Sequence, residues 1–180
     1  MKTVAIIGGT GNQGPGLALR WAKSGRYRVI VGSREAMKAQ IVAESLNTRL
    51  GEKVVEGMTN DAAAAAAEVV VLTVPYSAHA TTLESIRPHL RGKVLVDVTV
   101  PLQPPKVSRV YIPPGGSATA EAQALLGDEV RVVCAFQNVS ATHLPHLDEL
   151  FVCDVLVCGD DKDAKAEAIA LAEAAGLRGL

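Results

Sequence analysis

A glycine-rich segment between the first apolar run and the first amphipathic run constrains the fold of this chain most strongly. It reads GGTGNQG over residues 8–14, directly after the apolar residues 3–7, and has the spacing G-x-G-x-x-G at Gly9, Gly11 and Gly14. In a strand-turn-helix context, the first glycine permits a tight turn, the second lets the backbone approach a pyrophosphate, and the third permits close helix-strand packing. Free N–H groups and the helix dipole favour the negative charge. The segment predicts a dinucleotide-binding loop, with a merely flexible turn as the alternative.

Apolar runs typical of strands alternate with amphipathic runs typical of helices along most of the chain. Strands are expected at residues 3–7, 28–31, 53–58, 69–74, 93–97, 131–135 and 155–158. Helices are expected at residues 13–24, 35–50, 60–67, 77–90, 118–126 and 162–175. This alternation predicts an α/β fold: a doubly wound parallel sheet with helices on both faces, of Rossmann type.

The size and composition of the chain agree with that fold class. The 180 residues fit one dinucleotide-binding domain, residues 1–180. Aromatic residues make up 3% of the chain, so the core must consist of valine, alanine, leucine and isoleucine. Such a core suits a parallel sheet that is buried on both faces.

Charge and hydropathy exclude several classes of partner. The formal net charge is −1, with 18 basic and 19 acidic residues, so no overall field attracts nucleic acid or an anionic membrane. The longest apolar stretch ends at Pro75, well short of the roughly 20 residues of a spanning helix. The first residues lack the features of a signal peptide. We therefore expect a cytoplasmic protein whose partners are small-molecule cofactor substrates, with neither nucleic acid nor membrane.

The end of the second expected strand bears on which nucleotide is bound. NAD-binding folds usually place Asp or Glu there to accept hydrogen bonds from the ribose 2′-hydroxyl. This chain has Gly32-Ser33-Arg34 instead, and Lys38 follows Arg34 one helical turn later. Both cations can then converge on one anion. The pattern indicates a Rossmann-type NADP-binding fold, and solvated helix-surface charges are the alternative.

Prolines and glycines interrupt regular structure after residue 98. They predict a long surface loop, which is either a lid or pocket wall or a passive connector. The residues concerned are Pro101, Pro104, Pro105, Pro113, Pro114, Gly115 and Gly116.

Four side chains with reactive groups have simple structural interpretations. Cys134, Cys153 and Cys158 form an odd set without a C-x-x-C pair, and we expect them to be buried small hydrophobes. His79 follows the fourth expected strand. It could contact a ring in the pocket, but a helix-start histidine in water is the preferred interpretation.

No metal site is predicted. His143, His146 and Asp148 lack a third histidine or cysteine at a familiar spacing. Asp160 and Asp161 precede the last expected helix, where carboxylates cap free N–H groups and favour the dipole.

Several separate motifs together resemble one known family. They are residues 8–14, Gly32-Ser33-Arg34 with Lys38, Leu72-Thr73-Val74-Pro75-Tyr76, Val100-Pro101 and Cys158-Gly159-Asp160-Asp161. This combination resembles the NADPH-dependent coenzyme F420 reductases, along nearly the whole chain. The glycine loop and the Ser-Arg pair are also similar to the nucleotide-binding domains of six-transmembrane metalloreductases, so they do not decide the electron acceptor.

The resemblance implies an oxidoreductase that transfers hydride reversibly between NADP(H) and the deazaflavin coenzyme F420. It also implies a homodimer and a further helical segment beyond this sequence. Two alternatives stay open: an NADPH-dependent reductase of a flavin, ferric chelate or imine, and a non-catalytic NADP(H)-binding redox sensor.

The same resemblance assigns a cofactor-binding role to particular residues, and no catalytic acid, base or metal ligand. Besides Gly9, the pyrophosphate would be held by Thr10, Gly11, Asn12 and Gln13, and the 2′-phosphate by Ser33, Arg34 and Lys38. The cofactor or the reacting rings would be flanked by Pro75, Tyr76, Val100, Pro101, Asn138 and Ala141. For Tyr76, Val100 and Pro101, ordinary packing at strand ends is the alternative role.

Overall fold

Six parallel strands form the central sheet of the computed structural model, which describes residues 1–102, 111–149 and 151–180. The strands are β1 (Lys2–Ile7), β2 (Tyr27–Ser33), β3 (Val55–Thr59), β4 (Val69–Leu72), β5 (Val94–Asp97) and β6 (Arg131–Cys134). Their order is β3-β2-β1-β4-β5-β6, and every neighbouring pair is parallel. This order is that of a dinucleotide-binding Rossmann sheet, with its crevice where the order reverses beside β1.

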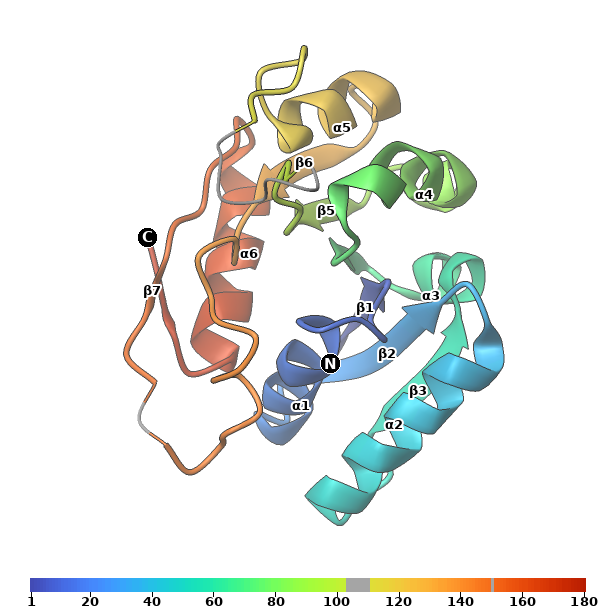
Figure 1. The fold of residues 1–180 in the computed structure, drawn as a ribbon, viewed down its shortest axis with the longest axis vertical. Helices are drawn as coiled ribbons and strands as arrows, with labels where there is room; N and C mark the ends of the chain where they lie inside the picture. Colours follow the sequence, from blue (N-terminus) through green and yellow to red (C-terminus); the bar gives the residue numbers. More distant parts are fainter. Residues whose placement is uncertain (103–110, 150) are drawn as a thin grey trace.

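Helices cover both faces of this sheet (Figure 1). They are α1 (Gly14–Lys23), α2 (Ala36–Leu50), α3 (Asn60–Ala66), α4 (His79–Ile86), α5 (Ala118–Leu126) and α6 (Lys162–Ala174). One apolar cluster joins α1, α2 and α6 to one face, and a second joins α3, α4 and α5 to the other. The predicted doubly wound α/β fold is confirmed.

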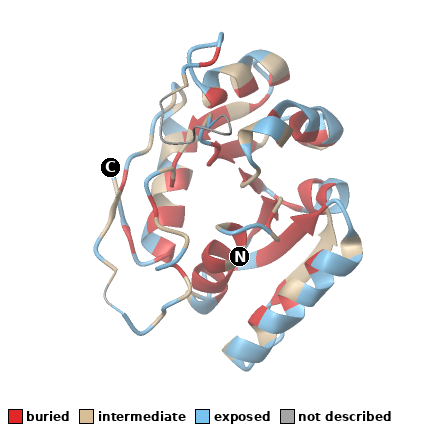
Figure 2. Ribbon diagram, viewed as in Figure 1, coloured by how far each residue is buried: buried red, intermediate tan, exposed pale blue. Residues whose placement is uncertain are grey.

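Alternation along each strand builds the two clusters. In β1, Val4 and Ile6 belong to the first cluster, whereas Ala5 and Ile7 belong to the second. Successive side chains of a strand point to opposite faces, so a strand covered on both sides must be apolar throughout. Figure 2 shows the result: the central strands are buried, the edge strand β3 is largely intermediate, and exposure lies on the outer helix faces and in the loops.

Two predicted elements differ from the observed ones. The helix expected at residues 77–90 is divided into the short 3₁₀ helix η1 (Tyr76–Ala78), α4, and a second 3₁₀ helix, η2 (Arg87–His89). Pro88 lies within η2, where its missing N–H and fixed ring disfavour continuation of an α-helix. The strand expected at 155–158 is only β7 (Asp154–Val155), which pairs with β8 (Arg178–Gly179) in a separate parallel ribbon. Apolar periodicity cannot identify the strand that will be the partner.

Of the other local predictions, some are confirmed and some are wrong. Asp161 caps α6, because its side chain accepts a hydrogen bond from the Ala164 N–H at 2.7 Å. Asp160 lies outside this cap and is exposed. The expectation of buried cysteines is wrong for Cys158, which is exposed, and Cys134 and Cys153 are half-buried.

The proline-rich loop is described only in part. Pro104 and Pro105 lie outside the described residues, so the predicted lid stays a prediction. The described end packs toward η1 and α5: the ring centroids of Tyr111 and Tyr76 lie 5.9 Å apart, and the Gly115 N–H donates to Glu121. Within the described ranges, no helix has both the length and the apolar character needed to span a bilayer.

Candidate dinucleotide site

The bend after β1 is set by close backbone contacts among its glycines. Gly8 has a φ of 71°, a left-handed conformation that side chains disfavour. The Gly9 N–H donates to the Gly32 carbonyl at 2.9 Å, and a Cβ on Gly9 would lie 2.7 Å from the Ile6 oxygen. A Cβ on Gly14 would lie 2.5 Å from the Gly9 Cα. The tight turn requires glycine at Gly8 for its conformation and at Gly9 because the Ile6 carbonyl, which accepts from the Gly9 N–H at 3.2 Å, leaves no room for a Cβ. Gly14 is required by close packing against Gly9.

Gly11 and the start of α1 remain available to a ligand. The nearest atom to a Cβ built on Gly11 would be the Gly8 oxygen, at 3.4 Å, so no protein side chain fills this position. Gln13, the N-cap residue, makes no side-chain cap. The first N–H groups of a helix have no acceptor within the helix. Room beside Gly11 and free N–H groups together fit a pyrophosphate.

A cleft of about 280 Å³ opens at this carboxyl edge of the sheet. Its walls include the predicted residues Thr10, Gly11, Ser33, Arg34, Lys38 and Pro75. Asn60, at the start of α3, also lines it, and its Oδ1 accepts a hydrogen bond from the Gly8 N–H at 3.2 Å. Sequence reasoning missed Asn60, because nothing local to α3 indicates a contact with the bend after β1.

The cations lie at the β2 end of the cleft. Ser33 is buried, and Arg34 is exposed on the same wall. Lys38 Nζ lies 2.6 Å from Glu35 Oε1, an ion pair whose side chains are 61% and 64% exposed. Exposed pairs of this kind contribute about 0–1 kcal/mol. Lys38 can therefore exchange Glu35 for a phosphate at small cost.

The side chain of Gln13 joins two loops that are distant in sequence. Its Nε2 donates to the Phe136 carbonyl at 2.9 Å and to the Val139 carbonyl at 3.5 Å. Phe136 is buried at a φ of 69°, and its ring meets Trp21 edge-on at 5.8 Å. An aromatic residue at positive φ is unusual and needs such support. Gln13 thus uses its side chain to hold the loop after β6 beside the glycine bend.

The remaining predicted residues do not line this cleft. Val100 is 38% exposed, Pro101 and Ala141 are half-buried, and Asn12 is exposed. Asn138 donates its side-chain N–H to the Asp154 carbonyl at 2.7 Å, which ties its loop to β7.

Tyr76 points away from the cleft. With His79 and Glu121, it lines a separate hollow of about 450 Å³ at α4 and α5. Its hydroxyl donates to Glu121 Oε2 at 2.8 Å, and its ring stacks on His79 with centroids 6.1 Å apart.

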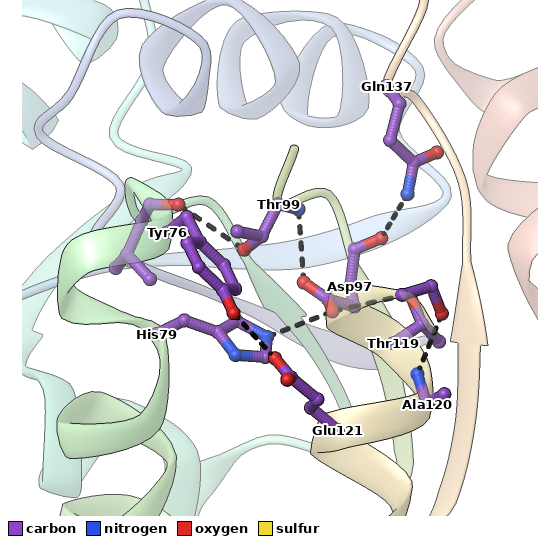
Figure 3. Close-up of polar contacts among 10 residues, drawn as sticks. Tyr76, His79, Asp97, Thr99, Thr119, Ala120, Glu121 and Gln137 are labelled. Carbon is purple, nitrogen blue, oxygen red and sulfur yellow. Dashed lines mark hydrogen bonds and ion pairs between the residues drawn. The ribbon is translucent and has the colours of Figure 1, made fainter. Parts of the chain in front are cut away.

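A buried carboxylate links the segments that surround this edge of the sheet (Figure 3). Asp97, at the end of β5, is 0% exposed, and its Oδ2 lies 3.0 Å from His79 Nε2 and 3.3 Å from Thr119 Oγ1. Its Oδ1 accepts the Thr99 N–H at 3.0 Å, and its carbonyl accepts from Gln137 Nε2 at 2.9 Å. Asp97 therefore connects α4, α5 and the loops after β5 and β6.

The expectation of a solvated His79 is wrong, since the residue is 2% exposed. One signal could have indicated this: Asp97 ends an otherwise apolar strand, and a buried charge needs a partner. Among the described residues, no group of three or more His, Cys, Asp or Glu side chains is arranged to hold a metal.

The Tyr76 hydroxyl should lose its proton only at an unusually high pH. The hydrogen bond to Glu121, and then burial, raise the pKa of Tyr76 to about 12. The folded pKa lies above the unfolded value of about 10. The contribution of this contact is therefore fully present below pH 10 and is lost as the pH rises through about 12. Phenolate absorbance after rapid pH jumps, with Tyr76→Phe to assign the signal, measures this.

Glu121→Gln is the control for that titration, because it removes the charge and keeps a hydrogen-bond acceptor. It should lower the pKa of Tyr76. An unchanged titration in Glu121→Gln would contradict the assigned cause.

Comparisons with known proteins place this site in a family context. Residues 3–101 match the family of NADP oxidoreductases that depend on coenzyme F420. The F420-dependent NADP reductase of Methanothermobacter thermautotrophicus is 46% identical over 94% of this chain and 75% of its own length. That of Methanocaldococcus jannaschii is 41% identical over 94% of this chain and 78% of its own length. A solved structure of a hypothetical protein from Sinorhizobium meliloti has 26% identity and a TM-score of 0.80, covering 100% of this chain and 84% of that one.

Proposed function

Because this chain belongs to the coenzyme F420-dependent NADP oxidoreductases, we propose that it transfers hydride reversibly between NADP(H) and the deazaflavin coenzyme F420. The observation that carries this proposal is the 41–46% identity with relatives named F420-dependent NADP reductase, along 94% of the chain. The chain is an oxidoreductase, and NADP and F420 are its cofactor substrates. The nicotinamide and the deazaflavin supply the redox chemistry, and the protein supplies binding and orientation.

The cleft is the binding site for NADP(H). Gly9 shapes the bend, while the backbone at Thr10, Gly11, Asn12 and Gln13 faces the pyrophosphate. Ser33, Arg34 and Lys38 hold the 2′-phosphate by charged hydrogen bonds. The support is the open space beside Gly11 and the grouping of Ser33, Arg34 and Lys38 on one wall.

The loops after β4, β5 and β6 orient the rings. Pro75, Val100, Pro101, Asn138 and Ala141 lie on these loops, and Tyr76 begins η1 behind them. Thr99 Oγ1 donates to the Val74 carbonyl at 3.3 Å, and Gln13 holds the loop after β6, so these loops are tied to one another and to the glycine bend. Loops held in this way would keep the nicotinamide and the deazaflavin in a reactive orientation and exclude water.

An acceptor comparison tests the proposal. NADPH should bleach the deazaflavin absorbance of F420 in the presence of the protein, and NADP should restore it from reduced F420. A flavin, a ferric chelate and a cyclic imine are assayed in parallel. Preference for one of these would identify another reductase, and tight NADPH binding without oxidation by any acceptor would indicate a redox sensor.

Three further features belong to this proposal. Residues 1–180 form one dinucleotide-binding domain, and the protein is a cytoplasmic homodimer. The β7–β8 ribbon supports the dimer, because Val152, Leu156 and Leu180 are exposed by 82%, 59% and 54% on it or beside it. The free cysteines support a reducing compartment. Light scattering and cell fractionation test the dimer and the location.

A further inference from the structure

Two cysteines face each other where the C-terminal part of the chain meets the last strand of the sheet. Cys134 ends β6, and Cys158 pairs with it in an antiparallel bridge. The Cys134 N–H donates to the Cys158 carbonyl at 2.8 Å, and the Cys158 N–H donates to the Cys134 carbonyl at 3.1 Å. The reciprocal bonds fix these two residues directly opposite each other.

This pairing is compatible with a disulfide. In an antiparallel pair that exchanges both bonds, the Cα atoms are about 5.5 Å apart. Disulfides span Cα distances of about 4.4–6.8 Å. Directly opposed residues also place their side chains on the same face. The neighbouring Gly159 packs closely on β6, since a Cβ there would lie 2.6 Å from Val133 Cγ1. In hydrogen-bonded pairs the Cβ atoms lie about 5.5 Å apart, whereas a disulfide needs about 3.5–4.5 Å. The bridge must therefore tighten slightly before the sulfur atoms can bond, and the resulting strain makes the bond easy to reduce.

The two thiols differ in accessibility. Cys158 is exposed, whereas Cys134 is half-buried. Burial, and next the adjacent Cys158, raise the pKa of Cys134. Since the thiolate is the nucleophile, Cys134 is the less reactive of the two at neutral pH.

We propose that Cys134 and Cys158 are a reversible redox pair that closes to an intramolecular disulfide by exchange with a small-molecule disulfide. The Cys158 thiolate attacks one sulfur of the reagent, its S–S bond breaks, and one thiolate leaves. Cys134 then loses its proton and attacks the Cys158 sulfur, which releases the second small thiol. Two protein thiols are oxidised while one disulfide is reduced to two thiols.

Closing this disulfide would constrain the carboxyl edge of the sheet, where the dinucleotide cleft lies. Cys134 is in register with Asp97 on β5 and directly precedes the loop that Gln13 holds. A covalent link would anchor the segment after β7 to that strand. It also closes a loop of 23 intervening residues, residues 135–157, which restricts the unfolded chain. The oxidised protein should therefore melt at a higher temperature than the reduced protein.

Oxidised glutathione is the probe, added to the reduced full chain. Intact mass should show loss of two hydrogens, alkylation should find one remaining thiol of the three, and peptide mapping should link Cys134 to Cys158. Dithiothreitol should reverse both the link and the rise in melting temperature.

Matched variants test the pairing. Cys153→Ser removes the third cysteine and should close as the wild type does. In Cys158→Ser, the thiols of Cys134 and Cys153 should both remain open to alkylation after treatment with oxidised glutathione. In Cys134→Ser, the reaction should stop at a glutathione adduct on Cys158. The proposal fails if the wild type keeps three alkylatable thiols, if the link uses Cys153, or if the melting temperature does not rise. If Cys134→Ser does not fold, Cys158→Ser at its exposed position still provides the comparison. None of these measurements uses F420 or NADPH, so they are independent of the proposed function.

Discussion

Arg34→Ala is expected to weaken NADPH binding by about 10- to 150-fold and to change NADH binding little. The guanidinium lies on the cleft wall beside buried Ser33, where a 2′-phosphate would lie. A hydrogen bond to a charged group contributes about 1.5–3 kcal/mol, which corresponds to that range of affinity. Titration calorimetry with both nucleotides measures the two dissociation constants.

The control for this prediction is Arg91→Ala. Arg91 is an exposed arginine that pairs with Glu129 at 2.8 Å and lies outside the cleft. It should leave both affinities unchanged. Equal losses for NADPH and NADH in Arg34→Ala would contradict the assignment of the 2′-phosphate site.

Asp97→Ala is expected to lower the free energy of unfolding by about 3–5 kcal/mol, because each of its three side-chain hydrogen-bond partners left unsatisfied costs about 1–3 kcal/mol. His79, Thr119 and the Thr99 N–H would lose their shared acceptor. A buried polar group without a partner retains its full desolvation cost. Urea denaturation followed by circular dichroism measures the difference.

Two variants sharpen this second prediction. Asp128→Ala removes an exposed carboxylate and should change stability by less than about 0.5 kcal/mol. Asp97→Asn keeps the size and one acceptor oxygen, so it should lose less than Asp97→Ala. A loss below about 1 kcal/mol in Asp97→Ala would show that the cluster does not hold α4, α5 and the two loops together.

Most elements and one part of the site were predictable from the sequence, because their causes are local. The period of apolar residues determined the order of strands and helices, and hence the doubly wound sheet. The spacing of Gly9, Gly11 and Gly14 identified the bend, and Ser33-Arg34 predicted a phosphorylated nucleotide, which agrees with the NADP-dependent family of the chain. Each of these signals lies within a few residues of the structure it specifies.

Tertiary structure alone decided the contacts between distant segments. Gln13 reaches a carbonyl 123 residues away, Asn60 meets the N–H of Gly8 across 52 residues, and His79 becomes buried against Asp97. Cys158 is exposed in a run that looked like buried strand, because its segment meets β6 in a single bridge. Such contacts depend on which ends of which strands the sheet order brings together. No local propensity contains that information, so the glycine bend was predictable while the side chains that hold its surroundings were not.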